Sequence, residues 1–451
     1  MSEGGTVRAP AGAGVVNWKE DIWKFACLYY FIPRTLVGMG VDKTLELIEQ
    51  WVDPQHRGSL EGLVQTPRQW RSGTQVNGWT VPQEWSLRNR SLIISSTGKI
   101  IADSNRSPLS VMIGSIPYTG VLTGAELLPQ LHYLPDYPEA IPYVTSYYSN
   151  EWGFCVDGGS YAFVRDHPMM PFQVELHSEL KSGWAEMLEY VLPGRLDQEI
   201  LFSTYICHPG MGNNETSGPA VLVNLIRWLC TQPRKYTYRF YFGPETLGPI
   251  CLLSDPGIRQ HLKERVIAGW VVTCVGDEWG WSYLETPSGT TLTDRVSQTI
   301  LKNRKPVTQY KFASRGSDER QWCYPTINLP IGSIMRSKYG TYREYHTDQD
   351  DLTFISAQGL FESFTCYQDV IQTLESVDRP RATSIGEPFL RQYGWKLPGK
   401  ELETAFIQDL LAYADGLESI PRLWANNFYQ KTFEEVQDGY AQLKELGLVE
   451  Y

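Results

Sequence analysis

Four polar segments spread along the chain carry the histidine and carboxylate side chains from which a metal site could be built. They contain His208, Glu245, Asp277 and His346, and the first three each follow an apolar run typical of a buried strand. Metal-dependent hydrolysis needs such ligands on several rigid elements, with an open position for water and a base nearby. Taken singly, each residue is better explained by a structural histidine or a solvated turn. Their shared position after strands, and their order His, Glu, Asp, His, favour a metal site.

This order resembles that of the co-catalytic zinc aminopeptidases, a superfamily that also includes glutamate carboxypeptidase and glutaminyl cyclase. The similarity is greatest to a bacterial branch of aminopeptidase-like proteins with a β insert and a C-terminal winged helix, and it covers about residues 18–451. The motifs that carry it are Trp79-Thr80-Val81-Pro82, Ile141-Pro142-Tyr143-Val144-Thr145-Ser146-Tyr147-Tyr148, Trp152-Gly153-Phe154-Cys155, Cys207-His208-Pro209, Gly316-Ser317-Asp318-Glu319-Arg320 and Tyr345-His346-Thr347.

The resemblance implies a site for two metal ions. His208 and Asp277 would hold one ion, and Glu245 and His346 would hold the other. A carboxylate on the loop before the next helix would bridge the two ions.

The bridging position is occupied here by Asn214, four residues before Gly218. An amide is neutral and offers a single carbonyl oxygen, so it bridges two cations poorly. The adjacent Glu215 could replace it if the loop turns differently, and the same polar loop could also be a helix cap. The expected cofactor is therefore zinc, as one ion or two.

A second departure concerns the general base. The family commonly has a Glu-Glu pair in which the first residue is the base and the second is a ligand, whereas Glu245 lies between Pro244 and Thr246. Another carboxylate must then take the proton from the metal-bound water, and it must reach that water directly. The candidates for this role are Glu215, Asp318 and Glu319. The candidates for substrate binding are Arg320 and Tyr345, and Asp318, Glu319 or aromatic faces could hold a substrate amine.

The elements around these residues follow the pattern of an α/β protein. Residues 200–206, 236–242 and 266–275 read as buried strands, and 218–230 reads as an amphipathic helix between the first two. Such alternation predicts a mostly parallel mixed sheet with helices on both faces. Sites in these sheets form at the carboxyl ends of the strands, which is where the candidate ligands lie.

The change of pattern along the chain predicts four parts. Residues 1–16 read as a flexible tail, and 17–75 with 177–380 as the aminopeptidase-like α/β domain, which begins with two helices within 18–51 and ends with one over 356–376. Residues 76–176 alternate short β-branched runs with turns, which indicates a small inserted β domain. Residues 385–451 read as short helices and a terminal strand, a pattern compatible with a winged-helix module.

Composition excludes several classes of protein. The 451 residues carry a formal net charge of −11, which argues against nucleic-acid binding as the main function. The eight dispersed cysteines form no C-x-x-C pair and indicate a reduced, cytoplasmic protein. No run approaches the ~18 apolar residues of a membrane span, so no membrane partner is expected. Assembly into a homo-oligomer stays open.

The function predicted from these residues is zinc-dependent hydrolysis of a small peptide or aminoacyl amide. Zinc would lower the pKa of a water molecule from ~15.7 toward ~7, and a carboxylate would accept its proton. One alternative is a repurposed amidase, transferase or cyclase in a biosynthetic pathway, because members of this fold can also cyclise their substrates. Another is a non-catalytic, metal-containing binding or scaffold protein.

Overall fold

The centre of the protein is a mixed, eight-stranded sheet. The computed structural model describes residues 16–53, 62–376, 379–395, 401–416 and 418–451. In spatial order the strands are β1 (Val64–Arg71), β12 (Trp184–Leu192), β14 (Thr237–Gly243), β13 (Glu199–Tyr205), β15 (Val266–Val271), β18 (Ile331–Met335), β16 (Trp281–Leu284) and β17 (Val307–Tyr310). The pairs β14–β13, β13–β15, β15–β18 and β16–β17 are parallel. The predicted α/β fold, with a mostly parallel mixed sheet, is confirmed.

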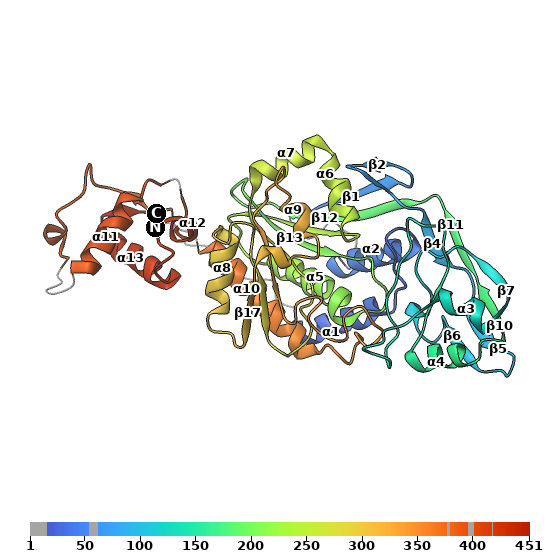
Figure 1. The fold of residues 1–451 in the computed structure, drawn as a ribbon. Helices are drawn as coiled ribbons and strands as arrows, with labels where there is room; N and C mark the ends of the chain where they lie inside the picture. Colours follow the sequence, from blue (N-terminus) through green and yellow to red (C-terminus); the bar gives the residue numbers. More distant parts are fainter. Residues whose placement is uncertain (1–15, 54–61, 377–378, 396–400, 417) are drawn as a thin grey trace.

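Both faces of this sheet are covered, because successive side chains of a strand point to opposite sides. On β13, Ile200 and Phe202 lie in one core and Leu201 lies in the other. The larger core is built with α1 (Trp18–Tyr30), α2 (Met39–Val52), α5 (Ser217–Leu229), α8 (Leu292–Leu301) and α10 (Ala357–Glu375). The smaller core is built with α6 (Leu247–Ser254), α7 (Pro256–Arg265) and α9 (Glu319–Trp322). Figure 1 shows these two groups of helices on opposite sides of the strands.

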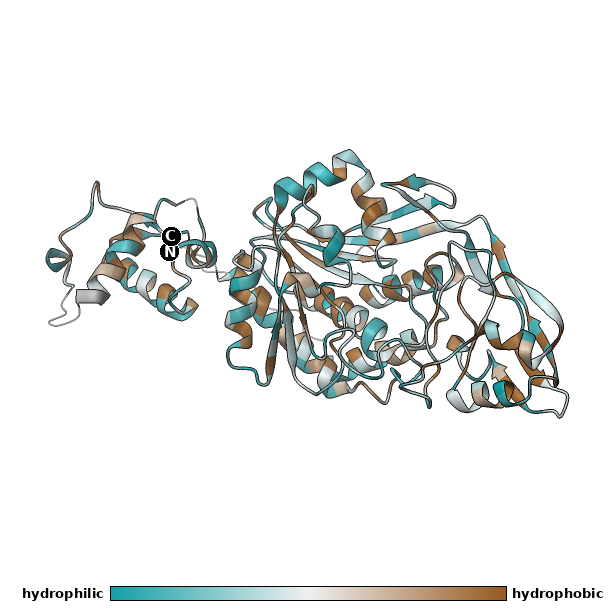
Figure 2. Cartoon of the chain, viewed as in Figure 1, coloured by the Kyte–Doolittle hydropathy of each residue, from teal (hydrophilic) through white to brown (hydrophobic). Residues whose placement is uncertain are grey.

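Helix composition follows burial on the smaller face. Seven of the eight residues of α6 are buried, whereas Leu262 is the one buried residue of α7. Figure 2 shows the corresponding contrast between the hydrophobic α6 and the hydrophilic α7. The inner helix therefore fixes the position of the loop after β14, which leads directly into it.

The helices expected near both ends of the α/β region are present. Ser356 caps α10 as predicted, because its side chain accepts a hydrogen bond from the backbone N–H of Gly359. The strand predicted over 266–275 was too long, since β15 ends at Val271. Two features explain this: the carbonyl of Val272 accepts from the Thr204 hydroxyl, and Cys274 has a φ of 53°, which no strand residue adopts.

Residues between β1 and β12 form a smaller, separate layer. Its antiparallel sheet has the order β6 (Ile100–Asp103), β5 (Leu92–Ser95), β10 (Pro171–Leu176) and β7 (Tyr118–Thr123), and it packs with α3 (Gly124–Leu127) and α4 (Gly158–Asp166) around a core of its own. Three short strand pairs accompany it: β4 (Glu84–Leu87) with β11 (Ser178–Lys181), β2 (Gln75–Val76) with β3 (Trp79–Thr80), and β8 (Leu131–His132) with β9 (Phe154–Cys155). The exact domain limits at 76 and 176 stay a prediction.

The C-terminal part consists of α11 (Glu401–Ala412), α12 (Ile420–Asn427) and α13 (Phe433–Glu445). Strands β19 (Arg381–Ala382) and β20 (Val449–Glu450) pair antiparallel beside them. The Tyr236 hydroxyl lies 2.8 Å from Ser419 Oγ, so this part contacts the residue that precedes β14. Its assignment as a winged helix stays a prediction.

Two further expectations concern the N-terminal tail and membrane-spanning helices. The flexible tail predicted over 1–16 lies outside the described residues except for Val16. Among the described helices, none combines the length and the apolar character needed to cross a bilayer.

Candidate active site

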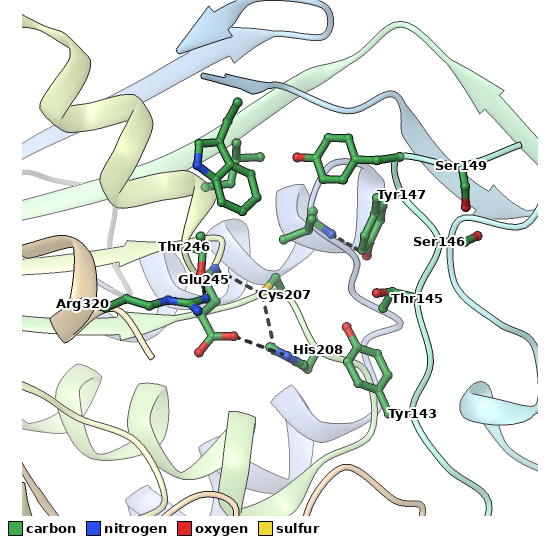
Figure 3. A pocket seen from close by; sticks show the side chains of 14 residues that line it. Tyr143, Thr145, Ser146, Tyr147, Ser149, Cys207, His208, Glu245, Thr246 and Arg320 are labelled. Carbon is green, nitrogen blue, oxygen red and sulfur yellow. Dashed lines mark hydrogen bonds and ion pairs between the residues drawn. The ribbon is translucent and has the colours of Figure 1, made fainter. Parts of the chain in front are cut away.

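His208 and Glu245 lie side by side because the strands before them are parallel neighbours. Tyr205 at the end of β13 pairs with Gly243 at the end of β14, so both loops leave the sheet at its carboxyl edge. His208 Nε2 is 3.7 Å from Glu245 Oε2. Figure 3 shows the two side chains pointing toward each other from their separate loops. The sequence could therefore anticipate this pair from the positions of two strand ends.

His346 reaches the same place from the segment between β18 and α10. Its ring centroid is 5.5 Å from that of His208, and the Tyr143 ring lies 5.0 Å from His208 and 5.1 Å from His346. The backbone N–H of Tyr143 donates to the His346 carbonyl at 2.8 Å, and Tyr345 stacks on the imidazole at 3.9 Å. The Nε2 atom of His346 is buried and has no hydrogen-bond partner among the described residues.

The two imidazoles differ in protonation. Burial, together with the charge of His208, lowers the pKa of His346 to about 3, so this ring is neutral. Burial also lowers the pKa of His208, but the neighbouring Cys207 and Glu215 outweigh it and raise this pKa well above its usual value. A neutral imidazole with an unpartnered nitrogen is the form that binds a metal ion.

Glu215 contacts His208 on the side of the ring that faces away from Glu245. Its Oε2 is 2.9 Å from His208 Nδ1, the ring nitrogen opposite the one that faces Glu245. The carboxylate is fully buried, 3.5 Å from the Arg34 guanidinium, and it accepts a hydrogen bond from the Tyr29 hydroxyl at 3.3 Å. Arg34 also donates to the His208 carbonyl at 3.1 Å. Glu215 thus fixes the ring orientation, as carboxylate partners of metal-binding histidines do.

Asn214 and Asp277 occupy the other side of the polar loop, which forms a single π turn, η3 (Gly212–Thr216), before α5. Asn214 Nδ2 donates to the Tyr205 hydroxyl at 2.6 Å, and its Oδ1 is buried without a partner. Asp277 accepts four hydrogen bonds, one from Asn213, two from Ser337 and one from Trp279. No hydrogen bond or ion pair among the described residues joins Asp277 to either imidazole.

Two more carboxylates lie beside Glu245. The loop after β14 is held by Asp318, whose Oδ1 accepts from the Thr246 N–H at 2.6 Å, and Ser317 Oγ donates to Glu245 Oε1 at 2.6 Å. Glu319 accepts from the Tyr339 hydroxyl. The second oxygens of Asp318 and Glu319, Oδ2 and Oε2, are buried without a hydrogen-bond partner.

Burial sets the proton affinity of this acidic group. It raises the pKa of Glu319 to about 7. It also raises the pKa of Asp318 well above its usual value, and the adjacent Glu245 adds to this effect. Carboxyl groups that exchange a proton near neutral pH are suited to general acid–base work.

The backbone is unusual at three positions around the site. Thr246, Cys274 and His346 all have positive φ angles, of 64°, 53° and 56°, although none is glycine. Such conformations cost about 1–3 kcal/mol each and persist where the surrounding structure imposes them. Here they turn the chain immediately after β14, after β15 and at the second histidine.

The types of donor fit a divalent cation. Two imidazole nitrogens and one carboxylate, from His208, His346 and Glu245, are the donor set of a catalytic zinc site that keeps one position open, although their donor atoms do not all lie within 4.8 Å of one another. The unpartnered Nε2 of His346 supports this assignment. A second group, of Cys207, His208 Nδ1 and Glu215, has donor atoms within 4.8 Å of one another, but the Arg34 cation already neutralises its carboxylate. Arg34 was not expected from the sequence, in which nothing relates residue 34 to the loop after β13, and Cys207 was noted only as part of a motif that carries the resemblance.

An open cavity of about 480 Å³ gives access to His208 and Glu245. Tyr143, Thr145 and Tyr147 line one side of it, and Glu245, Thr246 and Arg320 line the other (Figure 3). Tyr345 and His346 line a neighbouring cavity of about 450 Å³ on the other side of Tyr143. Of the two predicted substrate-binding residues, Arg320 therefore lines the cavity that holds His208 and Glu245, and Tyr345 lines the neighbouring cavity beside His346.

Comparisons with known proteins agree with this architecture. A family model described as "Domain of unknown function (DUF4910)" matches residues 23–377. A protein of Clostridium acetobutylicum, provisionally named a polysaccharide biosynthesis protein with aminopeptidase-like domain, is 36% identical over 368 residues, which is 81% of this chain and 78% of that one.

Solved structures give the same result for the fold. A crystal structure from Clostridium acetobutylicum, provisionally named a peptidase, is 31% identical with a TM-score of 0.80 and covers 96% of this chain and 97% of its own. A zinc aminopeptidase of Bacillus subtilis is 13% identical with a TM-score of 0.56, covering 79% and 95%. A peptidase M28 precursor of Shewanella amazonensis is 11% identical with a TM-score of 0.56, covering 80% and 93%. The aminopeptidase-like fold that the resemblance implies is confirmed.

Proposed function

We propose that this chain, which belongs to the family described as a domain of unknown function (DUF4910), hydrolyses amide or peptide bonds with a bound metal ion. The observation that carries the proposal is the meeting of His208, Glu245 and His346 from three separate segments, with the His346 Nε2 buried and unpartnered. These three side chains would hold one zinc ion. When bound, zinc would polarise an amide carbonyl and lower the pKa of a water molecule.

The chain's own residues would perform the other parts of the reaction. Glu215 and Arg34 hold the His208 ring in one orientation. Asp318 Oδ2 and Glu319 Oε2 are the free carboxyl oxygens beside Glu245, and they would accept the proton that the attacking water loses and return it to the leaving amine. Ser317 fixes the Glu245 carboxylate through its hydroxyl.

The free carboxyl oxygens of this group also suggest what the substrate carries. Asp318 Oδ2 and Glu319 Oε2 lie near Glu245, buried and without a hydrogen-bond partner among the described residues. A free amino terminus of the substrate would donate hydrogen bonds to these oxygens. The substrate would then be a small peptide or an aminoacyl amide.

Metal analysis of purified variants tests the proposal. We expect about one zinc ion per chain in the wild type, and its loss in His208→Ala and His346→Ala, because three protein ligands are the usual number at catalytic zinc. His177→Ala is the matched control, since this half-exposed histidine lies beside Glu175 and lines neither cavity. Unchanged zinc content in both site variants would remove the metal from the proposal.

A second candidate is an amide-forming or amide-cleaving step in a biosynthetic pathway. It is favoured by the provisional name of the 36% identical relative, which refers to polysaccharide biosynthesis, and by the neutral Asn214 at the expected bridging position. Assays of aminoacyl anilides and dipeptides beside amide-linked sugars would separate the two candidates. Zinc binding without cleavage of any of these compounds would favour the binding or scaffold role.

The cellular location is part of the same proposal. All eight cysteines are unpaired, and six of them are buried. Free thiols are typical of a reducing compartment, which supports the expected cytoplasmic location.

A further inference from the structure

A second and larger cavity, of about 770 Å³, opens beside the active-site cavity. The two cavities share Trp79 and Arg320 as lining residues, so a ligand that occupies one can extend into the other. The lining residues of the second cavity are Asn77, Trp79, Ile250, Leu253, Arg259, Arg315, Arg320, Gln321, Tyr324, Thr326 and Ile327. Three of these are arginines and none is acidic.

The charge of these arginines is not neutralised by ion pairs. Arg259 donates to the Leu253 carbonyl at 2.8 Å, and the Arg315 guanidinium lies 4.8 Å from the centroid of the Phe312 ring. Arg320 donates to the Thr246 hydroxyl, and its charge acts on the nearby Asp318 without an ion pair. Among the described residues, none of the three arginines has a carboxylate within salt-bridge distance.

The gathering of three such arginines at one cavity matters because the chain as a whole is acidic. It has 51 acidic and 40 basic residues, so acceptors for a guanidinium are plentiful. Other arginines of the described residues use them, as Arg239 does with Glu189 and Glu199. Three like charges gathered at one cavity repel each other, and a bound anion would compensate this repulsion. Guanidinium groups bind phosphate and carboxylate oxygens through paired hydrogen bonds.

The three arginines belong to two different parts of the structure. Arg259 lies on α7, while Arg315 and Arg320 flank the start of α9. The wall opposite them is the hairpin of β2 and β3, whose two-residue turn has positive φ at Asn77 and Gly78, of 46° and 83°. An Asn-Gly turn of this kind is the tightest link between two strands, and here it presents Trp79 to both cavities.

Aromatic surface accompanies the positive charge. Trp79 is 41% exposed and Tyr324 is 58% exposed, and both line the cavity. The ammonium of Lys263 donates to the carbonyl of Thr326, another lining residue, and adds a fourth cation near the rim. The cavity therefore offers two ring faces next to a group of cations.

From these observations we infer that the second cavity binds an anionic group of the substrate, a phosphate or a carboxylate. The inference rests on the proposed function for its geometry, since the amide would lie at His208 and Glu245 and the anion beyond Arg320. Arg320 donates a hydrogen bond to Thr246, the residue after Glu245, and so connects the proposed anion site with the proposed metal ligands. The substrate class is thus an amide that carries an acidic group on the side away from the metal ligands.

Calorimetric titration of the full-length protein tests the anion site without an activity assay. The probes are inorganic phosphate, pyrophosphate and citrate, each titrated into the wild type and into His208→Ala, which removes binding to a metal at the imidazoles. We expect saturable binding in both proteins. Stronger binding of pyrophosphate assigns the site to phosphorylated substrates, and stronger binding of citrate assigns it to carboxylates.

Substitutions locate the binding. Arg259→Gln and Arg315→Gln are each expected to weaken the preferred anion by about tenfold or more, since a hydrogen bond to a charged group is lost. Arg106→Gln, an exposed arginine that lines neither cavity, should bind as the wild type does. Circular dichroism and thermal unfolding check that each variant is folded.

The inference is overturned if no probe binds, or if a folded Arg259→Gln, Arg315→Gln double variant binds as tightly as the wild type. Failure of the proposed function gives a different result, because anion binding would persist in a protein that neither holds zinc nor cleaves amides.

Discussion

The imidazole of His208 meets a carboxylate at each of its two nitrogens. Glu245 faces Nε2 at 3.7 Å from the cavity, and Glu215 contacts Nδ1 at 2.9 Å from the protein interior. The Glu245 side chain is 21% exposed and lines the cavity, whereas Glu215 is fully buried beside Arg34. Glu245 is therefore placed to bind a ligand, and Glu215 to hold the ring.

Glu215→Gln is expected to lower both the stability of the folded protein and the zinc affinity of the site. The substitution leaves the Arg34 charge buried without its partner, which typically costs about 3–5 kcal/mol of stability. Zinc affinity should fall about 10–100-fold, the usual effect of removing the group that orients a metal-binding histidine. Urea unfolding and competition with a chelator measure the two effects. Glu175→Gln, at an exposed His177 contact, is the control, and equal zinc affinity in both variants would contradict the assignment.

Asp318→Asn should separate catalysis from metal binding. Because Asp318 is assigned to proton transfer and not to the metal, we expect zinc content to stay unchanged while kcat falls about 10²–10⁴-fold. Glu319→Gln is the parallel variant, since its free Oε2 makes it the other candidate. Steady-state kinetics on an aminoacyl anilide measure the effect. Full activity in both variants would show that neither carboxyl group transfers the proton.

Residue types alone could suggest His208, Glu245 and His346 but not their surroundings. The partner of Glu215 is Arg34, 181 positions earlier in the chain, and no local pattern connects the two. Asp277 follows a strand as Glu245 does, and only the fold shows that Asn213, Ser337 and Trp279 already donate to its carboxylate. A side chain's surroundings depend on contacts between distant segments, whereas its place after a strand depends on the local sequence.

At the scale of elements, the ends of β13 and β14 were predictable because both strands are buried runs flanked by polar loops. The end of β15 was not, because the apolar run Val272-Val275 continues beyond it into a turn that tertiary contacts impose. The same limit applies to Tyr143, which belongs to the segment between β8 and β9 and reaches a site built on another sheet. Periodicity describes an element and says little about which other element it meets.

The packing of α2 on β12 carries a titratable pair that should make stability depend on pH. Burial, with the charge of Asp42 added, raises the pKa of Glu186 from 4.5 to about 7. Between these pH values the folded protein keeps a proton that the unfolded chain has lost, so stability falls as the pH rises through this window. Glu186→Gln should flatten this dependence and unfold at higher urea concentration than the wild type at pH 8.

Urea unfolding at pH 5 and pH 8 measures the difference for each protein. Glu264→Gln, at an exposed position of α7, is the control and should keep the slope of the wild type. An unchanged pH dependence in Glu186→Gln would show that the pair on α2 and β12 does not titrate as described.

At the scale of the whole molecule, a metal ion would add a further link between three segments that are far apart in the chain. His208, Glu245 and His346 span 139 residues of the chain. A ligand present at about 1,000 times its Kd adds about 4 kcal/mol to stability, provided that it binds only the folded state. Removing zinc with a chelator should therefore lower the Tm of the wild type in differential scanning calorimetry. The His208→Ala, His346→Ala double variant should show no such shift, and an equal shift would place the effect elsewhere.

Tyr143 comes from the inserted layer, yet its ring lies against both imidazoles and its backbone N–H is bonded to His346. The candidate site is therefore shared between the central sheet and the inserted layer. A chimera that exchanges the inserted layer with that of a relative should change which compounds are accepted, provided that it retains this tyrosine. Deletion of the inserted layer would also remove Tyr143 and its contacts with both imidazoles.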